Sequence, residues 1–344
     1  MNNECRLIAA CRRQSTDCTP VWFMRQAGRY LPEYRELRKK YSMLEMVNRP
    51  DLAAEVTLQP LQRFDLDAAI IFADILLPLP VIGAEFSFVE GVGPRIHDPL
   101  RDPLAVEQLR EGNPEEDLEF VARTIKLVRE MLAPGKALIG FAGAPFTLAS
   151  YIIEGGHSRN YLETKKIMHR NPESWNKLLD IITSVTIRYL DMQIKAGVDA
   201  VQLFDSWVGA LSPSDYRDFV KPFTARVFAS LEKFSVPTIH FGTGTAGFLD
   251  EMREAGGTVQ SVDWRIPLRE AWKKIGFDSA IQGNLDPLAM MAPPDLLKRK
   301  VEAVLEEAEG RPGHIFNLGH GFLPGTPIEN VELVVNLVHE STAG

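Results

Sequence analysis

Two arginines four positions apart stand out among the residues of this chain that could do chemistry. Arg25 and Arg29 follow an apolar run at residues 22–24, and Gly28 between them allows the backbone to turn closely around a ligand. Each guanidinium can bind a carboxylate through paired hydrogen bonds, a geometry that Lys cannot match. A solvated loop would explain either Arg alone. The neighbouring buried run favours a carboxylate-binding loop, which consists of Arg25, Gln26, Ala27, Gly28 and Arg29.

Asp74 is a carboxylate inside an otherwise apolar stretch, residues 68–77. A carboxylate in such surroundings is costly unless it meets hydrogen-bond donors or a cation. One interpretation is that Asp74 caps the next helix. The other is that it receives N–H groups of a ligand, and the sequence leaves both open.

His320 lies between Gly319 and Gly321, which leave its ring uncovered, and this favours a functional role over a structural one. His240 ends a predicted strand and is interpreted as structural. The remaining histidines show no pairing at metal-ligand spacing, and the chain has neither H-E-x-x-H nor Cys-x-x-Cys. We therefore predict no metal site.

Residues 242–247 read GTGTAG, a literal G-x-G-x-x-G, and Asp263 follows 21 residues after Gly242. This spacing is typical of a dinucleotide-binding fingerprint. The motif belongs, however, to the fifth strand–helix unit rather than the first. Loops of a barrel also use glycines to open a helix N-terminus toward an anion. NAD binding is thus the weaker interpretation.

The elements that must position these residues recur along the whole chain. Short apolar runs, most of them followed by a helical pattern, predict strands at residues 21–24, 69–72, 138–141, 200–204, 238–241, 259–262, 280–282 and 315–318. A long helical pattern opens at Asn171-Pro172-Glu173 and runs to Ala196-Gly197, where the glycine ends it. Eight such units predict a (β/α)8 TIM barrel, in which catalytic groups follow the carboxyl ends of the strands.

We expect one catalytic barrel domain over residues 1–344, with extended βα loops and an N-terminal extension, residues 1–18, packed on or near the barrel. The largest loop, residues 76–94, is expected to carry a small hairpin around residues 85–89. No Pro/Ser-rich linker divides the chain.

Composition excludes several classes of protein. The chain has 344 residues, 45% of them hydrophobic, and a net charge of −8, which argues for a globular protein and against a nucleic-acid binder. All three cysteines precede residue 19, which indicates a reducing compartment. No membrane span and no signal peptide are recognisable, so we expect a cytoplasmic protein. Residues 1–50 carry ten Lys/Arg against five Asp/Glu, which predicts a local site for an anion.

Five motifs follow one another along nearly the whole chain. They are TPVWFMRQAGRYLPEY at residues 19–34, IFADIL at 71–76, GFAGAPFTLASY at 140–151, FDSW at 204–207 and NLGHG at 317–321. Together and in this order they resemble the uroporphyrinogen decarboxylase family. The resemblance implies a distorted (β/α)8 barrel, a homodimer, and no cofactor or metal. It also implies the substrate uroporphyrinogen III, whose four acetates lose CO₂ to give coproporphyrinogen III in haem biosynthesis.

The resemblance also assigns roles to residues. Asp74 would accept hydrogen bonds from the pyrrole N–H groups and stabilise the cation formed when the ring is protonated. Arg25, Arg29 and His320 would hold substrate carboxylates, and Tyr151 and Ser206 would add hydrogen bonds. Arg25 is a candidate proton donor, but a guanidinium is a weak acid at neutral pH, so the donor stays open.

Two further functions are weighed against this one. A cobalamin-linked methyltransferase shares the barrel but needs zinc ligands of the His-x-Cys…Cys type, and all cysteines of this chain lie before residue 19. A tetrapyrrole carrier would use the same arginine loop. It gives no reason for Asp74, because a carrier has no cation to stabilise.

Overall fold

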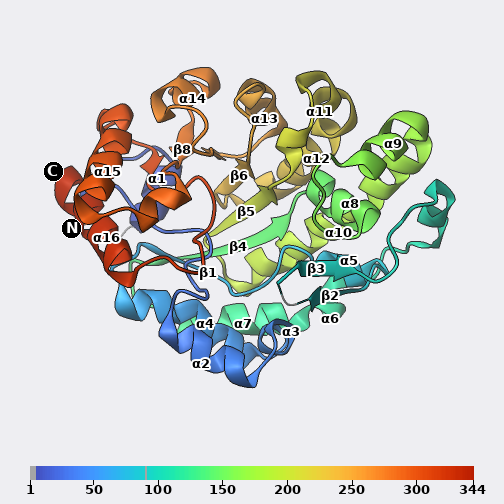
Figure 1. Ribbon diagram of the computed structural model, residues 1–344, viewed down its shortest axis with the longest axis horizontal. Helices are drawn as coiled ribbons and strands as arrows, with labels where there is room; N and C mark the ends of the chain where they lie inside the picture. The colour runs from blue at the N-terminus through green and yellow to red at the C-terminus, as the bar shows by residue number, and fades with distance from the viewer. Residues whose placement is uncertain (1–4, 90) are drawn as a thin grey trace.

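The computed structural model describes residues 5–89 and 91–344, and its centre is a curled parallel sheet (Figure 1). The order of the strands in this sheet is β1-β4-β5-β6-β7-β8-β9, so each strand lies beside the next one along the chain. The bounds are β1 Ala68–Ile70, β4 Ala137–Gly143, β5 Ala200–Asp205, β6 Thr238–Gly242, β7 Val259–Ser261, β8 Ala280–Gln282 and β9 His314–Ile315. This arrangement confirms the expected TIM-barrel class.

The two edges of the sheet are linked by the segment that precedes the arginine loop. Phe316 N–H donates to Pro20 O at 2.9 Å, which joins the segment to β9. Asp67 N–H donates to Val21 O, also at 2.9 Å, which joins it to β1. The buried Asp67 carboxylate accepts from Val21 N–H as well, at 2.8 Å. The first barrel position is therefore filled by an extended segment.

The strand expected at residues 21–24 is reduced to a single bridge between Val21 and Phe316. Side chains take the place of a neighbouring strand, because Phe23 N–H donates to Gln26 Oε1 at 3.0 Å and Met24 N–H donates to Asn317 Oδ1 at 3.2 Å. The other expected strands are present within a few residues of their predicted bounds. This reduced first strand is the distortion of the barrel.

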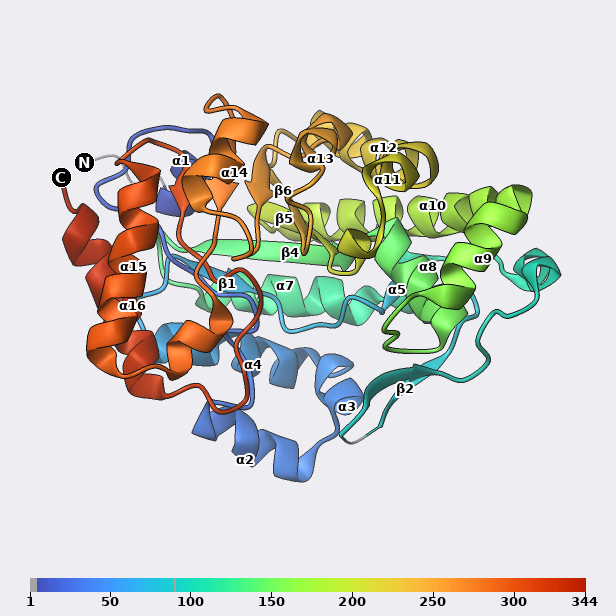
Figure 2. The same ribbon diagram turned by 45° about the horizontal axis from the view of Figure 1, so that its top comes forward.

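Helices surround the sheet, and two views at different angles show them on all its sides (Figures 1 and 2). Those in the first half of the chain are α1 Arg6–Cys11, α2 Pro32–Lys40, α3 Met43–Val47, α4 Pro50–Arg63, α5 Pro78–Val81, α6 Pro114–Asp117, α7 Glu119–Met131, α8 Pro145–Glu154 and α9 Leu162–Arg170. Those in the second half are α10 Pro172–Ala196, α11 Pro213–Phe219, α12 Lys221–Leu231, α13 Leu249–Ala255, α14 Leu268–Ile275, α15 Pro294–Ala308 and α16 Ile328–Thr342. Short 3₁₀ helices span Pro103–Gln108, Val208–Ala210, Glu232–Phe234 and Pro287–Met291. None of the helices in the described part of the chain is long and apolar enough to cross a membrane.

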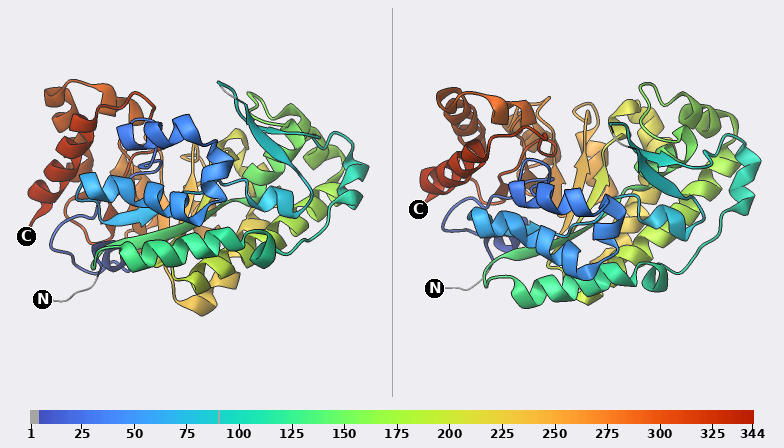
Figure 3. Two further views of the ribbon diagram at one scale, coloured as in Figure 1. Left: turned by 90° about the horizontal axis from the view of Figure 1, so that it is seen from below. Right: turned by 60° about the horizontal axis from the view of Figure 1, so that its bottom comes forward.

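The long helix α10 has the predicted bounds and ends at Gly197, whose φ of 118° lies in the left-handed region open to glycine. The loop after β1 carries the expected hairpin, formed by β2 Phe86–Val89 and antiparallel β3 Gly93–Ile96. Figure 3 shows this hairpin standing out beside α3. The first helix, α1, packs against β8 and β9.

Side chains in the barrel interior are arranged in layers. In the middle layer Trp22 Nε1 donates to Gln282 Oε1 at 2.9 Å, and Gln282 Nε2 donates to Gln202 Oε1 at 3.0 Å. Toward the carboxyl ends of the strands, Phe204 contacts the edges of both Phe141 and Phe241, at centroid distances of 5.4 and 5.5 Å. These rings fill the interior directly beneath the loops that follow the strands.

Candidate active site at the carboxyl end of the barrel

The arginine loop is held in place by Gln26. This side chain is 1% exposed, accepts from Phe23 N–H and donates to Ala68 O at 2.9 Å. The backbone carbonyl oxygen of Gln26 accepts from Tyr30 Oη at 2.8 Å. Both polar ends of the Gln26 amide are thus bonded to protein backbone, so this predicted binding residue acts as a brace for the loop.

Arg25 projects from this braced loop with a φ of 61°, a left-handed conformation that is uncommon for a residue with a side chain. Arg25 and Arg29 are both exposed, and neither makes an ion pair with any residue in 5–89 or 91–344. A Cβ added at Gly28 would lie 3.2 Å from Arg25 O, so glycine fits this turn best. Two unpaired guanidiniums therefore lie after the first barrel position.

The loop after β9 meets the arginine loop, although almost 300 residues separate them. Phe322 N–H donates to Met24 O at 3.1 Å, and its ring packs on Phe23 and Tyr30 at centroid distances of 4.9 and 4.8 Å. A Cβ at Gly321 would lie only 2.4 Å from Arg25 Cδ. The side chain of Arg25 thus runs across Gly321 and is held beside His320.

The imidazole of His320 is neutral at physiological pH. Its Nδ1 accepts from Gly321 N–H at 2.7 Å, which assigns the proton of the neutral ring to Nε2. Burial, together with the positive charges of Arg25 and Arg265, lowers the pKa of His320 to about 4. Its Nε2–H is therefore available as a neutral donor.

Asp74 follows β1, and one of its two carboxylate oxygens is bonded to a described residue. Oδ1 accepts from Leu76 N–H at 2.9 Å, which is the capping role weighed from the sequence. Oδ2 makes no hydrogen bond with the described residues. Burial raises the pKa of Asp74 to about 6, while the bond from Leu76 and the charge of Arg25 oppose this rise. Capping and ligand binding are thus compatible in this carboxylate.

Tyr151 lies on α8 and stacks on Trp207, which follows β5, with ring centroids 3.8 Å apart. Burial raises the pKa of the Tyr151 phenol, and the negative charge of Asp74 adds to this rise. The phenol therefore keeps its proton at neutral pH and can donate it in a hydrogen bond. Ser206 precedes Trp207, and its carbonyl oxygen accepts from Thr243 Oγ1 at 2.6 Å.

Arg25, Asp74, Tyr151 and His320 come from four separate loops and helices, yet they are electrostatically coupled. The charge of Arg25 lowers the pKa values of the other three, and the charge of Asp74 raises that of Tyr151. Arg29 extends from the same loop as Arg25, and Ser206 follows β5. The arrangement provides two cations, a carboxylate with a free oxygen, and two neutral donors.

Trp207 and Arg265 lie near residues of the candidate site, although the sequence interpretation did not assign them. Trp207 was part of a quoted motif, but only the fold shows that its ring lies against Tyr151. Arg265 had no signal except its place three residues after Val262, the end of a predicted strand.

The glycine motif at residues 242–247 has a structural use. Gly244 N–H donates to Asp263 Oδ2 at 2.7 Å, and Arg265 N–H donates to Asp263 Oδ1 at 3.2 Å. Asp263 is 1% exposed and also forms an ion pair with the Arg265 guanidinium. Both oxygens of Asp263, the carboxylate at the fingerprint spacing, are occupied, so this geometry does not support a dinucleotide site. His240 is structural, since Nδ1 lies 3.2 Å from Met252 O and the ring is buried.

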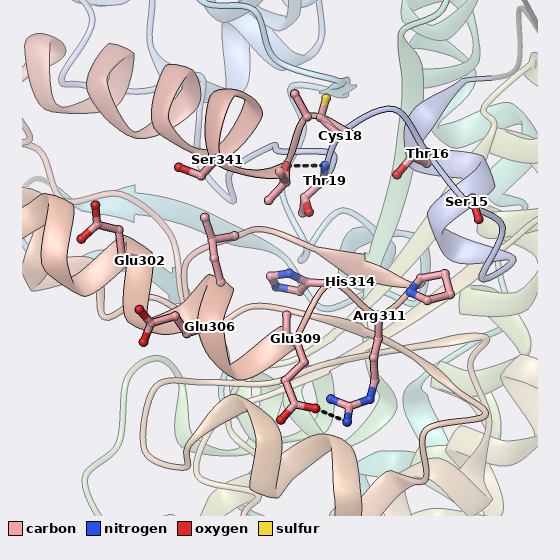
Figure 4. A pocket seen from close by; sticks show the side chains of 17 residues that line it. Ser15, Thr16, Cys18, Thr19, Glu302, Glu306, Glu309, Arg311, His314 and Ser341 are labelled. Atoms are coloured by element: carbon pink, nitrogen blue, oxygen red, sulfur yellow. Dashed lines mark hydrogen bonds and ion pairs between the residues drawn. The ribbon is translucent and has the colours of Figure 1, made fainter.

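A cavity of about 800 Å³ lies at the opposite, amino-terminal end of the strands (Figure 4). Cys18, Glu306, Glu309, Arg311 and His314 are among the residues that line it, and none of the predicted site residues does. Among the residues that the structure describes, no three His, Cys, Asp or Glu side chains are grouped to hold a metal ion. All three cysteines are free.

Comparisons with known proteins agree on one family. The family model for uroporphyrinogen decarboxylase (URO-D) matches residues 2–341. Uroporphyrinogen decarboxylase of Sorangium cellulosum is 56% identical over 334 residues, which cover 97% of this chain and 95% of that protein. The enzyme of the same name from Carboxydothermus hydrogenoformans is 52% identical over 333 residues, with the same coverage.

Solved structures support the fold. A methyltransferase from Methanosarcina mazei has a TM-score of 0.82 over 98% of both chains, at 22% identity. A B12-independent methionine synthase from Shewanella sp. W3-18-1 has a TM-score of 0.58 at 10% identity, covering 88% of this chain and 90% of that one. At these identities the likeness concerns the architecture alone.

Proposed function

This chain belongs to the uroporphyrinogen decarboxylase family, and from that premise we propose how its own residues decarboxylate uroporphyrinogen. It is a carboxy-lyase of porphyrin synthesis. We propose that it converts the four acetate side chains of uroporphyrinogen III to methyl groups, which gives coproporphyrinogen III. The observation that carries the assignment of the site is Asp74, a partly buried carboxylate with one free oxygen beside Arg25 and Tyr151.

Substrate binding is assigned to the residues around the arginine loop. Arg25 and Arg29 bind substrate carboxylates through paired hydrogen bonds, because neither guanidinium has an ionic partner among the described residues. The neutral His320 donates from Nε2, and Ser206 adds a hydroxyl. Gln26, whose amide is bonded to the backbone, acts by holding the loop, and Ala27 and Gly28 allow the substrate to approach it.

The chemical step needs a place for the electrons that CO₂ leaves behind. A pyrrole acetate has no neighbouring carbonyl group, so the ring itself is first protonated at carbon and becomes a cation. Loss of CO₂ then neutralises this cation and leaves an exocyclic methylene group. A proton adds to the methylene carbon and the ring carbon releases the proton it had taken up, so each acetate becomes a methyl group with a net uptake of one proton. Asp74 accepts hydrogen bonds from the pyrrole N–H groups and stabilises the cation, with its charge in place before the reaction.

Tyr151 supports this step as a neutral donor next to Asp74, held by its stack on Trp207. Arg25 fixes the reacting acetate and keeps Asp74 ionised, since its charge opposes the effect of burial on the pKa of that carboxyl. We assign no proton donor, because the pKa of a guanidinium is too high for Arg25 to be an effective acid at neutral pH.

The assembly and location belong to the same proposal. A homodimer is implied by the family resemblance, and analytical ultracentrifugation of the purified chain would measure it. Three free cysteines agree with a reducing compartment such as the cytoplasm.

The direct test is anaerobic incubation of the purified chain with uroporphyrinogen III and no added cofactor. We expect coproporphyrinogen III and four equivalents of CO₂, measured by chromatography of the oxidised porphyrins and by gas release. Recovery of unchanged octacarboxylate would refute the proposed function. Dependence on an added metal or nucleotide would refute the cofactor-free mechanism.

A further inference from the structure

The proposed substrate requires more positive charge than the assigned residues supply. Uroporphyrinogen carries eight carboxylates, whereas Arg25 and Arg29 are the only cations in the proposed binding set. His320 adds no charge at neutral pH, since burial lowers its pKa to about 4. A further cation at the carboxyl end of the barrel, with a fixed position and open donors, would match this charge.

Arg265 follows β7, and its position is fixed by the carboxylate of Asp263. Asp263 is buried and accepts from Gly244 N–H, from Arg265 N–H and from Arg265 Nη1. The guanidinium carbon also lies 4.3 Å from the centre of the Trp264 ring. A buried carboxylate and an aromatic face thus hold the guanidinium while its side chain stays 52% exposed.

Because Gly319 has no side chain, the loop that carries Arg265 can lie close to the proposed site. A Cβ there would lie 2.6 Å from Trp264 N and 2.8 Å from Trp264 Cε3. The loop after β7 therefore packs directly on the loop that carries His320. Consistent with this packing, the charges of Arg25 and Arg265 both lower the pKa of the His320 ring.

The open donors of Arg265 point to a ligand of opposite charge. Only Nη1 of the guanidinium is bonded to Asp263, and Nε and Nη2 have no partner among the described residues. We propose that Arg265 binds a carboxylate of the substrate, with Asp263 as the residue that positions it. This inference rests on the proposed function and adds a third cation, from the opposite half of the chain, to Arg25 and Arg29.

A purely structural ion pair is the alternative. It would hold the loops after β6 and β7 together through Gly244 and Asp263, and loss of the guanidinium would then change stability without a specific effect on substrate binding. Steady-state kinetics with uroporphyrinogen III separate these roles, because a lost carboxylate contact raises KM.

The experiment compares Arg265→Gln with Arg253→Gln. Arg253 is an exposed arginine on α13 that pairs with Asp278 at 2.7 Å, so its variant matches the loss of charge and of an ion pair. We expect Arg265→Gln to raise KM about tenfold with kcat within about twofold of the parent, and Arg265→Lys to restore part of the loss. Arg253→Gln should leave both constants unchanged.

A spectroscopic measurement tests the location independently. Because the charge of Arg265 lowers the pKa of His320, Arg265→Gln should raise it, and NMR titration of the labelled imidazole would record the change. Asp263→Asn should raise KM less than Arg265→Gln does, and should have no further effect on KM in the Arg265→Gln background.

The outcomes are distinct. An active parent whose KM is unchanged by Arg265→Gln would overturn this inference and leave the proposed function standing. An equal rise of KM in Arg253→Gln would also overturn it, since the effect would then be one of general charge. An inactive parent would refute the proposed function itself.

Discussion

Two strand ends of this barrel carry a carboxyl group with a raised pKa, yet the groups face different surroundings. Asp74 follows β1, and Asp205 ends β5. Burial raises the pKa of Asp74 to about 6 and that of Asp205 to about 7. By this measure alone Asp205 would be the stronger candidate for a functional carboxyl group.

The direction of each side chain reverses that ranking. Successive residues of a strand point to opposite faces, and Phe204 already points into the barrel. Asp205 therefore points outward, where Thr147 Oγ1 on α8 donates to its Oδ1 at 2.7 Å. Its Oδ2 is buried and has no hydrogen-bond partner among the described residues, and its negative charge raises the pKa of the Tyr216 phenol on α11. Asp205 thus braces the helices, whereas Asp74 has an open oxygen and a cation beside it.

The largest expected effect separates these two carboxyl groups by their charge. Asp74→Asn should lower kcat about 100- to 1000-fold, because the variant keeps the shape of the side chain and loses the counter-charge for the pyrrole cation. Asp205→Asn should retain activity within about threefold, since an amide resembles the neutral acid and can still accept from Thr147. Anaerobic initial rates at saturating substrate measure both.

Near-normal turnover in Asp74→Asn would contradict the role of Asp74 as cation stabiliser. A loss in Asp205→Asn equal to that in Asp74→Asn would show that the direction of the side chain is a poor guide to function in this barrel. Circular dichroism of both variants controls for folding.

The second prediction concerns the cation beside Asp74. The charge of Arg25 lowers the pKa of Asp74, so Arg25→Gln should raise it. Activity requires the ionised carboxylate and should fall as the pH drops through about 6 in the parent. In the variant this acid limb should lie at higher pH, and kcat/KM at its optimum should be about 100-fold lower. The pH dependence of kcat/KM tests both expectations.

Arg29→Gln is the matched control for this measurement. It removes an equal charge from the same loop, but Arg29 is not among the groups that shift the pKa of Asp74. Its acid limb should remain where the parent has it, although KM rises. An unmoved limb in Arg25→Gln would mean that Arg25 does not tune Asp74.

The sequence could predict strand ends but not the direction of the side chains that follow them. Apolar runs located the strands, and the barrel rule brought Arg25, Asp74 and His320 to one end. Asp205 is equally a polar residue at a strand end, and only the alternation beyond Phe204 shows that it faces helices. Single-strand patterns carry too little information for that distinction where both faces are buried.

Long-range partners were equally hidden from the sequence. Gln26 belonged to the predicted binding loop, but its amide meets the backbone of Ala68, 42 residues away. Asp263 had the spacing of a ribose ligand, and it proved to bond Gly244 and Arg265. In both cases the side chain bonds to backbone groups of other loops or strands, and these partners depend on the packed fold rather than on local spacing.

A third prediction uses stability to compare the two carboxyl groups. The folded state disfavours the ionised form of both, so each group lowers stability as the pH rises from about 4 through its folded pKa, about 6 for Asp74 and about 7 for Asp205. At pH 8 we expect Asp205→Asn to add about 2 kcal/mol and Asp74→Asn about 1 kcal/mol, the smaller value because Asp74 is partly exposed.

Urea denaturation at pH 4 and pH 8 measures these differences. Both should shrink to about 0.5 kcal/mol or less at pH 4, where the folded carboxyl groups are protonated and those of the unfolded chain are only about half ionised. A stabilisation that is equal at the two pH values would assign the gain to packing instead of to charge.

The smallest expected effect concerns the contact that holds Arg25 in place. A Cβ at Gly321 would lie 2.4 Å from Arg25 Cδ and 2.5 Å from Cγ, so Gly321→Ala must displace this side chain. We expect kcat/KM to fall about fivefold, less than in Arg25→Gln, because a long side chain can rotate and keep its charge. Gly325→Ala is the control from the same loop, since its Cβ would lie 3.4 Å from Met291 Cε, an ordinary contact. Equal rates in the two alanine variants would show that the position of Arg25 is set by its left-handed backbone alone.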